Sequence, residues 1–129
     1  MDNVILACNV YSYGRYLQRA FEHMQATGIR YAEVSIGKPE DADEWLEQVR
    51  PYGIHISSVI CPCDISSDES VEGFAEIARA VSRIGAQIAF VSVHAGELPL
   101  PDVYRRLRRI GDIANGAGVK VAMETHPDL

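Results

Sequence analysis

The feature of this chain that most constrains its fold is a short motif that occurs four times. Each copy has a glycine, then an apolar residue, then a run of residues suited to a β-strand, and the copies start at Gly28, Gly53, Gly85 and Gly118. Glycine readily adopts the left-handed conformation that ends many helices. The strand-like runs are almost continuously apolar, as in parallel strands that are covered on both faces. The motif therefore predicts four helix-to-strand junctions.

Amphipathic helices are predicted between these strands, because apolar residues recur there at helical spacing. The four apolar stripes are Leu17, Ala20, Phe21 and Met24; Ala42, Trp45, Leu46 and Val49; Phe74, Ile77, Ala78 and Val81; and Val103, Leu107, Ile110 and Ala114. Pro39 and Pro101 lie where helices are expected to start, and Ser67 is a candidate cap for the third helix. A further strand is predicted over residues 4–10.

The resulting order, with strands and helices in strict alternation, predicts an α/β fold with a parallel sheet and right-handed crossovers. The 129 residues are enough for one domain, taken here as residues 1–129. Two architectures satisfy this order: an open doubly wound sheet and a closed barrel. Residues 11–15, after the first strand, contain neither GxGxxG nor a phosphate-binding loop. The pattern alone leaves the choice open.

The charge of the chain argues against a nucleic-acid partner. The formal net charge is -6, whereas a protein that neutralises phosphates usually carries a basic face. The one arginine cluster is Arg105, Arg106, Arg108 and Arg109. Its spacing predicts the solvated side of a helix rather than a phosphate site.

The cysteine count and the hydropathy of the chain indicate the cellular compartment in which the protein is expected to work. The three cysteines, an odd number without a visible secretory signal, indicate a reducing compartment, and we expect the cytoplasm. No apolar run approaches the roughly 20 residues that span a bilayer, so no membrane association is expected. Cys61 and Cys63 do not form a CxxC motif, and we expect them to be structural.

Titratable side chains collect at the predicted strand ends, where parallel α/β folds bind their ligands. Glu33 lies in the second strand, His94 follows the fourth, and Glu124 and His126 end the fifth. Carboxylates and imidazoles at one edge of a sheet can bind a divalent ion and can transfer protons. The spacing of Glu124 and His126 places both on one side of an extended segment. For each of the four, a structural role is the alternative.

Three segments of the chain resemble the xylose isomerase-like TIM barrels, the sugar phosphate isomerase/epimerase superfamily that also includes apurinic-site endonucleases. The segments are Gly-Ile-Arg-Tyr-Ala-Glu-Val at the second strand, Val-Ser-Val-His-Ala-Gly at the fourth, and Gly-Val-Lys-Val-Ala-Met-Glu-Thr-His-Pro at the fifth. The resemblance covers essentially the whole chain but only about five of the eight units of a (β/α)8 barrel. It implies the N-terminal half of such a barrel, with about five parallel strands and four intervening helices.

The resemblance also implies roles for the four candidate residues. Glu124 matches a metal-binding glutamate, which also serves in catalysis, and the metal is a divalent ion (Mn, Mg, Co or Zn). His94 matches a histidine that lines the site, Glu33 a glutamate that shapes the pocket, and His126 a substrate-contacting position. The further metal ligands of the family come from later strands, so the chain is expected to be an incomplete fragment that is inactive alone.

The activity implied by the resemblance is proton transfer next to the carbonyl of a small carbohydrate or sugar phosphate, assisted by the metal. Other activities of the superfamily stay open: an apurinic-site endonuclease-like phosphodiesterase, and a dehydratase or hydrolase. A different class of function is a non-catalytic half-barrel that assembles with another chain, because an open parallel sheet leaves unpaired edges. Completion is expected from a second copy in a homo-oligomer or from a missing C-terminal half.

Overall fold

The computed structural model describes residues 4–129. Within them the chain forms one parallel sheet whose strands are β1 (Ala7–Asn9), β2 (Tyr31–Ser35), β3 (His55–Ile60), β4 (Ile88–Ser92) and β5 (Lys120–Glu124). The strands lie side by side in sequence order, β1-β2-β3-β4-β5. A doubly wound sheet reverses its strand order at a switch point. Because this sheet does not, the choice that the sequence left open is decided in favour of the barrel type.

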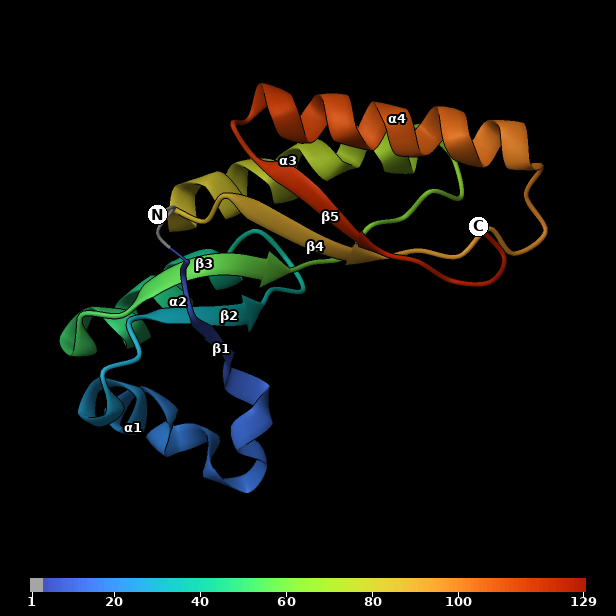
Figure 1. The fold of residues 1–129 in the computed structure, drawn as a ribbon. Helices are drawn as coiled ribbons and strands as arrows, with labels where there is room; N and C mark the ends of the chain where they lie inside the picture. Colours follow the sequence, from blue (N-terminus) through green and yellow to red (C-terminus); the bar gives the residue numbers. More distant parts are fainter. Residues whose placement is uncertain (1–3) are drawn as a thin grey trace.

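The connections between the strands are helical. They are η1 (Val10–Arg19) with α1 (Ala20–Thr27), α2 (Asp41–Val49) with η2 (Arg50–Tyr52), α3 (Asp68–Ile84) and α4 (Leu100–Gly116). The sheet is curved and the helices gather on its outer side, so the inner side is open (Figure 1). No helix within residues 4–129 has the length and apolar character needed to cross a membrane.

The glycine motif has the structural meaning predicted for it. Gly28 (φ 80°), Gly53 (φ 63°) and Gly85 (φ 86°) each follow a helix in the left-handed conformation and lead into the next strand. The predicted cap is also present, because the Ser67 hydroxyl oxygen accepts a hydrogen bond from the backbone N–H of Ser70. These local signals fix where the helices of the fold start and stop.

The core lies between the sheet and the helices. Alternate residues of the strands, such as Ala32, Val34 and Val91, are fully buried against the predicted helical stripes, from which Phe74, Ala78 and Ile110 are buried. The side chains between them face the open inner side. Trp45 ties α2 to the end of β2, because its indole N–H donates to the Ser35 carbonyl at 2.8 Å.

A β-bulge interrupts the pairing of β2 with β3. Ala32 pairs with Ile56, but the next residue, Glu33, pairs with Ser58, so Ser57 has no opposite residue. The burial of β3 changes phase at the same point: Ile54 and Ile56 are buried before the bulge, and Val59 and Cys61 after it. The bulge therefore turns Ser58, rather than Ser57, toward the side of the sheet that carries Glu33.

The first strand is shorter than predicted. Residues 4–10 were expected to form it, yet β1 comprises Ala7–Asn9, and Val4, Ile5 and Leu6 are exposed. Ala7 pairs with Tyr31, the first residue of β2, so the residues before Ala7 have no strand beside them. At the other end Asn9 caps η1 by accepting from the backbone N–H of Tyr11, which ends the extended conformation.

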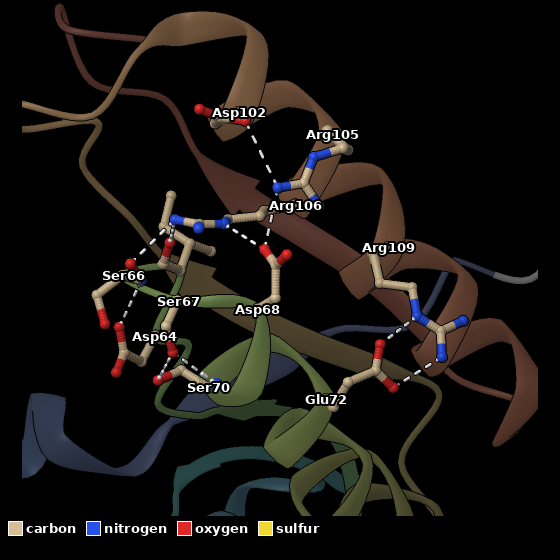
Figure 2. A network of polar contacts seen from close by, with 11 residues as sticks. Asp64, Ser66, Ser67, Asp68, Ser70, Glu72, Asp102, Arg105, Arg106 and Arg109 are labelled. Atoms are coloured by element: carbon tan, nitrogen blue, oxygen red, sulfur yellow. Dashed lines mark hydrogen bonds and ion pairs between the residues drawn. The ribbon is translucent and has the colours of Figure 1, made fainter.

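The arginine cluster is the second correction. Three of its four members bind carboxylates of α3 (Figure 2): Arg105 and Arg106 contact Asp68, and Arg109 binds Glu72 through two nitrogens at 2.6 and 2.8 Å. The Arg106 side chain is only 14% exposed and also donates to the Ile65 and Ser66 carbonyls. The prediction of a solvated face is therefore wrong for Arg106, which joins α4 to the start of α3.

Candidate functional site

The candidate site lies at the carboxyl ends of the strands, on the open inner side of the sheet. The register places polar residues of neighbouring strands opposite one another there: Asn9 pairs with Glu33, Glu33 with Ser58, and Ser92 with Glu124. Parallel in-register strands present such residues on one face. Their side chains form two separate groups.

The first group, called here the Glu33 cluster, consists of Asn9, Glu33 and Ser58. Asn9 Nδ2 donates to Glu33 Oε1 at 3.0 Å, and the Ser58 hydroxyl donates to Glu33 Oε2 at 2.7 Å. Both carboxylate oxygens are thus held by donors from the strands on either side. Hydrogen bonds to a carboxylate are among the stronger ones in proteins, so the Glu33 side chain is fixed in position.

The second group, the Glu124 cluster, consists of Ser92, His94, Glu124, His126 and Asp128. The imidazoles of His94 and His126 stack with ring centroids 3.8 Å apart. His126 Nε2 lies 2.8 Å from the Ser92 hydroxyl and 3.7 Å from Glu124 Oε2. His94 Nδ1 lies 3.3 Å from Asp128 Oδ1, and the Gly96 backbone N–H donates to Asp128 Oδ2 at 3.2 Å.

The Glu124 cluster contains a serine, a histidine and a glutamate, but it is not a nucleophilic triad. In a triad the serine contacts one imidazole nitrogen and the acid contacts the other. Here Ser92 and Glu124 both approach Nε2 of His126. The carboxylate therefore cannot orient the imidazole as a base for the serine, and the geometry offers no support for a serine hydrolase.

The electrostatics differ between the ends of β3 and β5. Burial, with a smaller effect of the neighbouring thiol, raises the pKa of Cys61 to about 12, and burial with the Asp64 charge raises the pKa of Cys63 to about 11. Both thiols are therefore protonated at neutral pH, in agreement with a structural role. The Gly96 N–H, with His94 as a smaller contribution, lowers the pKa of Asp128, so that carboxyl is ionised.

The structure brings together three of the four predicted residues. Glu124, His94 and His126 lie in one cluster, whereas Glu33 contacts Asn9 and Ser58 across two other strands. The sequence reasoning did not assign Asn9, Ser58, Ser92 or Asp128 to the site. Asn9 and Ser92 end β1 and β4, so the strand-end criterion could have indicated them, whereas Ser58 depends on the register of β3 with β2.

The described residues do not form the metal site that the resemblance implies. Across residues 4–129, no group of three or more His, Cys, Asp or Glu side chains is placed so that it could hold a metal ion. In the Glu124 cluster the donors approach one another as pairs, His94 with Asp128 at 3.3 Å and Glu124 with His126 at 3.7 Å. Zinc sites, whether structural or catalytic, use at least three protein ligands, so these residues do not form a zinc site by themselves.

Comparison with known proteins adds the wider context. No family model and no curated protein matches the chain. A solved sugar phosphate isomerase/epimerase from Parabacteroides distasonis has a TM-score of 0.70 at 18% identity, with 98% of this chain and 52% of that one covered. A D-tagatose 3-epimerase-like protein gives 0.68 at 18% identity, covering 98% and 54%.

A third solved structure, a xylose isomerase domain protein from Alicyclobacillus acidocaldarius, has a TM-score of 0.60 at 15% identity, covering 95% of this chain and 46% of that one. The chain spans about half the length of these structures. At such identities the likeness concerns the fold. This chain therefore has the fold of about half of a TIM barrel, of the kind found in sugar phosphate isomerase/epimerases and xylose isomerase-like proteins.

Proposed function

We propose that this chain supplies about half of the active site of a metal-dependent sugar or sugar-phosphate isomerase/epimerase. The observation that carries the proposal is the position of Glu124 at the carboxyl end of β5, on the open face and beside His126. Its side chain is 53% exposed, and its carboxylate approaches His126 Nε2 at 3.7 Å. Such a carboxylate keeps its lone pairs for a ligand. The half-barrel fold supports the same proposal.

In this proposal Glu124 is a ligand of a divalent ion (Mn, Mg, Co or Zn) and the group that exchanges a proton with the carbon next to the substrate carbonyl. A bound ion of this kind polarises carbonyl oxygens. We propose that its remaining protein ligands come from beyond the described residues, because Glu124 and His126 supply two of the three or more that a zinc site, for example, requires. His94 and His126 contact the substrate from one side and Glu33 from the other.

The test measures solvent deuterium incorporated next to the carbonyl of a ketose, with Mn²⁺ present, in the protein as its source cell produces it. We expect Glu124→Gln to lower incorporation by at least about a hundredfold, the usual contribution of a general acid or base. Glu97→Gln, at an exposed position of the neighbouring loop, serves as the control. Retained exchange in the Glu124 variant would sink the assignment.

The open face of the sheet supports the further proposal that additional strands complete the barrel. Apolar side chains that a closed barrel would cover are exposed here, among them Val4, Ile5, Leu6, Ile88 and Met123. The covering strands come from a longer chain or from a partner chain, which includes a second copy of this one. Exposed apolar surface and unpaired strand edges both favour association.

The intact mass of the protein in its source cell separates these cases. A mass near twice 14.2 kDa places the remaining strands in the same chain, and a mass of 14.2 kDa requires assembly, which light scattering then measures. A monodisperse monomer of 14.2 kDa that binds no metal contradicts both the enzyme and the assembly.

A phosphodiesterase acting on damaged DNA is the weaker candidate. Three of the four clustered arginines are engaged, because Arg105 and Arg106 contact Asp68 and Arg109 binds Glu72. Nucleic-acid affinity depends on basic groups that are free to release counterions. Salt-sensitive binding to DNA that contains an abasic site is the result that would favour this candidate over the epimerase.

A further inference from the structure

In the Glu33 cluster, Asn9 and Ser58 have a role of their own beside the one proposed for Glu33. Glu33 lies in β2, with Asn9 of β1 opposite it on one side and Ser58 of β3 on the other. One neutral donor reaches each carboxylate oxygen, at 3.0 Å from Asn9 and 2.7 Å from Ser58. A carboxylate has about four lone-pair positions. Two of these are occupied, and the others stay available on the open side of the sheet.

The amide of Asn9 has a defined orientation because it makes two contacts. Its Oδ1 accepts from the backbone N–H of Tyr11 at 2.9 Å, which caps η1, and its Nδ2 donates to Glu33. A flipped amide would place a donor against the Tyr11 N–H and an acceptor against the carboxylate. Asn9 therefore couples the turn that follows β1 to the orientation of Glu33.

We propose that Asn9 and Ser58 are positioning residues that hold the Glu33 carboxylate as a fixed acceptor for a hydroxyl group of the substrate. The acceptor role rests on the proposed function, whereas the positioning concerns the protein alone. A preorganised acceptor binds without first losing side-chain freedom. Because both partners of Glu33 are neutral, its charge is uncompensated by them and repels anions. This side of the site accordingly takes the hydroxyl-bearing end of a substrate, and not a phosphate.

The decisive variant is Asn9→Ser, because serine still caps the Tyr11 N–H and carries no charge but lacks the amide group that donates to Glu33. Asn9→Ala removes both contacts, and Ser58→Ala removes the other donor. Ser57→Ala is the matched control: its hydroxyl donates to the Ala32 carbonyl at 3.3 Å, and it is the residue next to Ser58 in the same strand. Thermal unfolding of each variant reports whether the cap of η1 is retained.

The readout is the ¹³C resonance of the Glu33 carboxylate in the ligand-free chain at neutral pH. Asn9→Ser and Ser58→Ala should shift it and broaden it as the side chain samples a second rotamer, and Ser57→Ala should leave it unchanged. If Asn9 acts only as a helix cap, Asn9→Ser leaves the resonance where it is in the wild type, and the positioning role is overturned.

The acceptor role is tested with glycerol, a neutral triol, and with glycerol phosphate. Glycerol should shift the Glu33 resonance in a saturable way, with about tenfold weaker apparent affinity in Asn9→Ser, and glycerol phosphate should bind more weakly than glycerol. The absence of a glycerol-dependent shift, or tighter binding of the phosphate, overturns the acceptor role. Neither readout depends on deuterium exchange, so failure of the proposed reaction would be recognised separately.

Discussion

The two polar clusters differ in how completely their acidic residue is held. In the Glu33 cluster each carboxylate oxygen accepts a short hydrogen bond from an adjacent strand. In the Glu124 cluster the carboxylate is half exposed and approaches one imidazole nitrogen at 3.7 Å. Both glutamates lie on the open face, Glu33 as the middle residue of β2 and Glu124 as the last residue of β5.

The difference follows from strand neighbours. β2 lies between β1 and β3, whereas β5 is paired with β4 alone within the described residues. A residue in a central strand finds partners on both sides, and a residue in an edge strand finds them on one. One side of the site is therefore held by hydrogen bonds from both neighbouring strands, whereas β5 on the other side has β4 as its one neighbour among the described residues.

The largest expected effect concerns the thiols that follow β3, which also has a neighbour on each side. Because burial raises the pKa of Cys61 to about 12 and that of Cys63 to about 11, their thiolate fractions at pH 8 are small. We expect alkylation by iodoacetamide to be at least about a hundredfold slower than that of a free cysteine, whose pKa is about 8.5. Peptide mass spectrometry measures both rates, and urea should abolish the difference. Equal alkylation rates in folded and unfolded protein would contradict the burial of these two thiols.

A smaller effect compares the two glutamates directly. Glu33→Ala should lower the free energy of unfolding by about 1–2 kcal/mol, because it leaves the donors of Asn9 and Ser58 unpaired. Glu124→Ala should change it by less than about 0.5 kcal/mol, the usual result for a surface substitution. Urea unfolding of both variants provides the measurement. An equal loss of unfolding free energy in the two variants would show that Glu124 is held as firmly as Glu33. That result would contradict the difference between the two clusters.

The smallest effect is local and acid-dependent. The Gly96 N–H lowers the pKa of Asp128 in the folded chain. The contact is therefore complete above the ordinary carboxyl pKa of about 4 and is lost as the pH falls through the lower folded value. The amide resonance of Gly96 should therefore shift in that acidic range, as nuclear magnetic resonance would measure. Asp128→Asn keeps an acceptor but has no charge to lose, so its Gly96 resonance should not titrate there.

Much of the fold was predictable because its signals are local. The glycine motif and the apolar stripes located four helix-to-strand junctions, and the structure confirms the parallel α/β half-barrel. The extent of β1 was not predictable, since Val4, Ile5 and Leu6 suit a strand but have no strand beside them. Arg106 was misjudged for a similar reason: its partner Asp68 lies on another helix, 38 positions away in the chain.

The candidate site, like the fold, was predictable only where its signals are local. Strand ends indicated Glu33, His94, Glu124 and His126, whose roles stay predictions. The partners of Glu33 depend on register, which the sequence does not contain. With Ser57 and Ser58 adjacent in β3, only the bulge decides which hydroxyl reaches the carboxylate. Long-range pairing of this kind has no local signature.

The bulge opposite Glu33 shifts the alternation of buried and open-side residues along β3 by one position. Upstream of it the even-numbered Ile54 and Ile56 are buried, and downstream the odd-numbered Val59 and Cys61 are. Deleting Ser57 would remove the bulge and leave an uninterrupted alternation in which Ser58 still faced the open side and Val59 the helices, whereas pairing Ser57 with Glu33 without a bulge would exchange the two faces of everything that follows. One unpaired residue thus keeps the second half of a strand, and a hydroxyl of the site, in phase with the rest of the sheet.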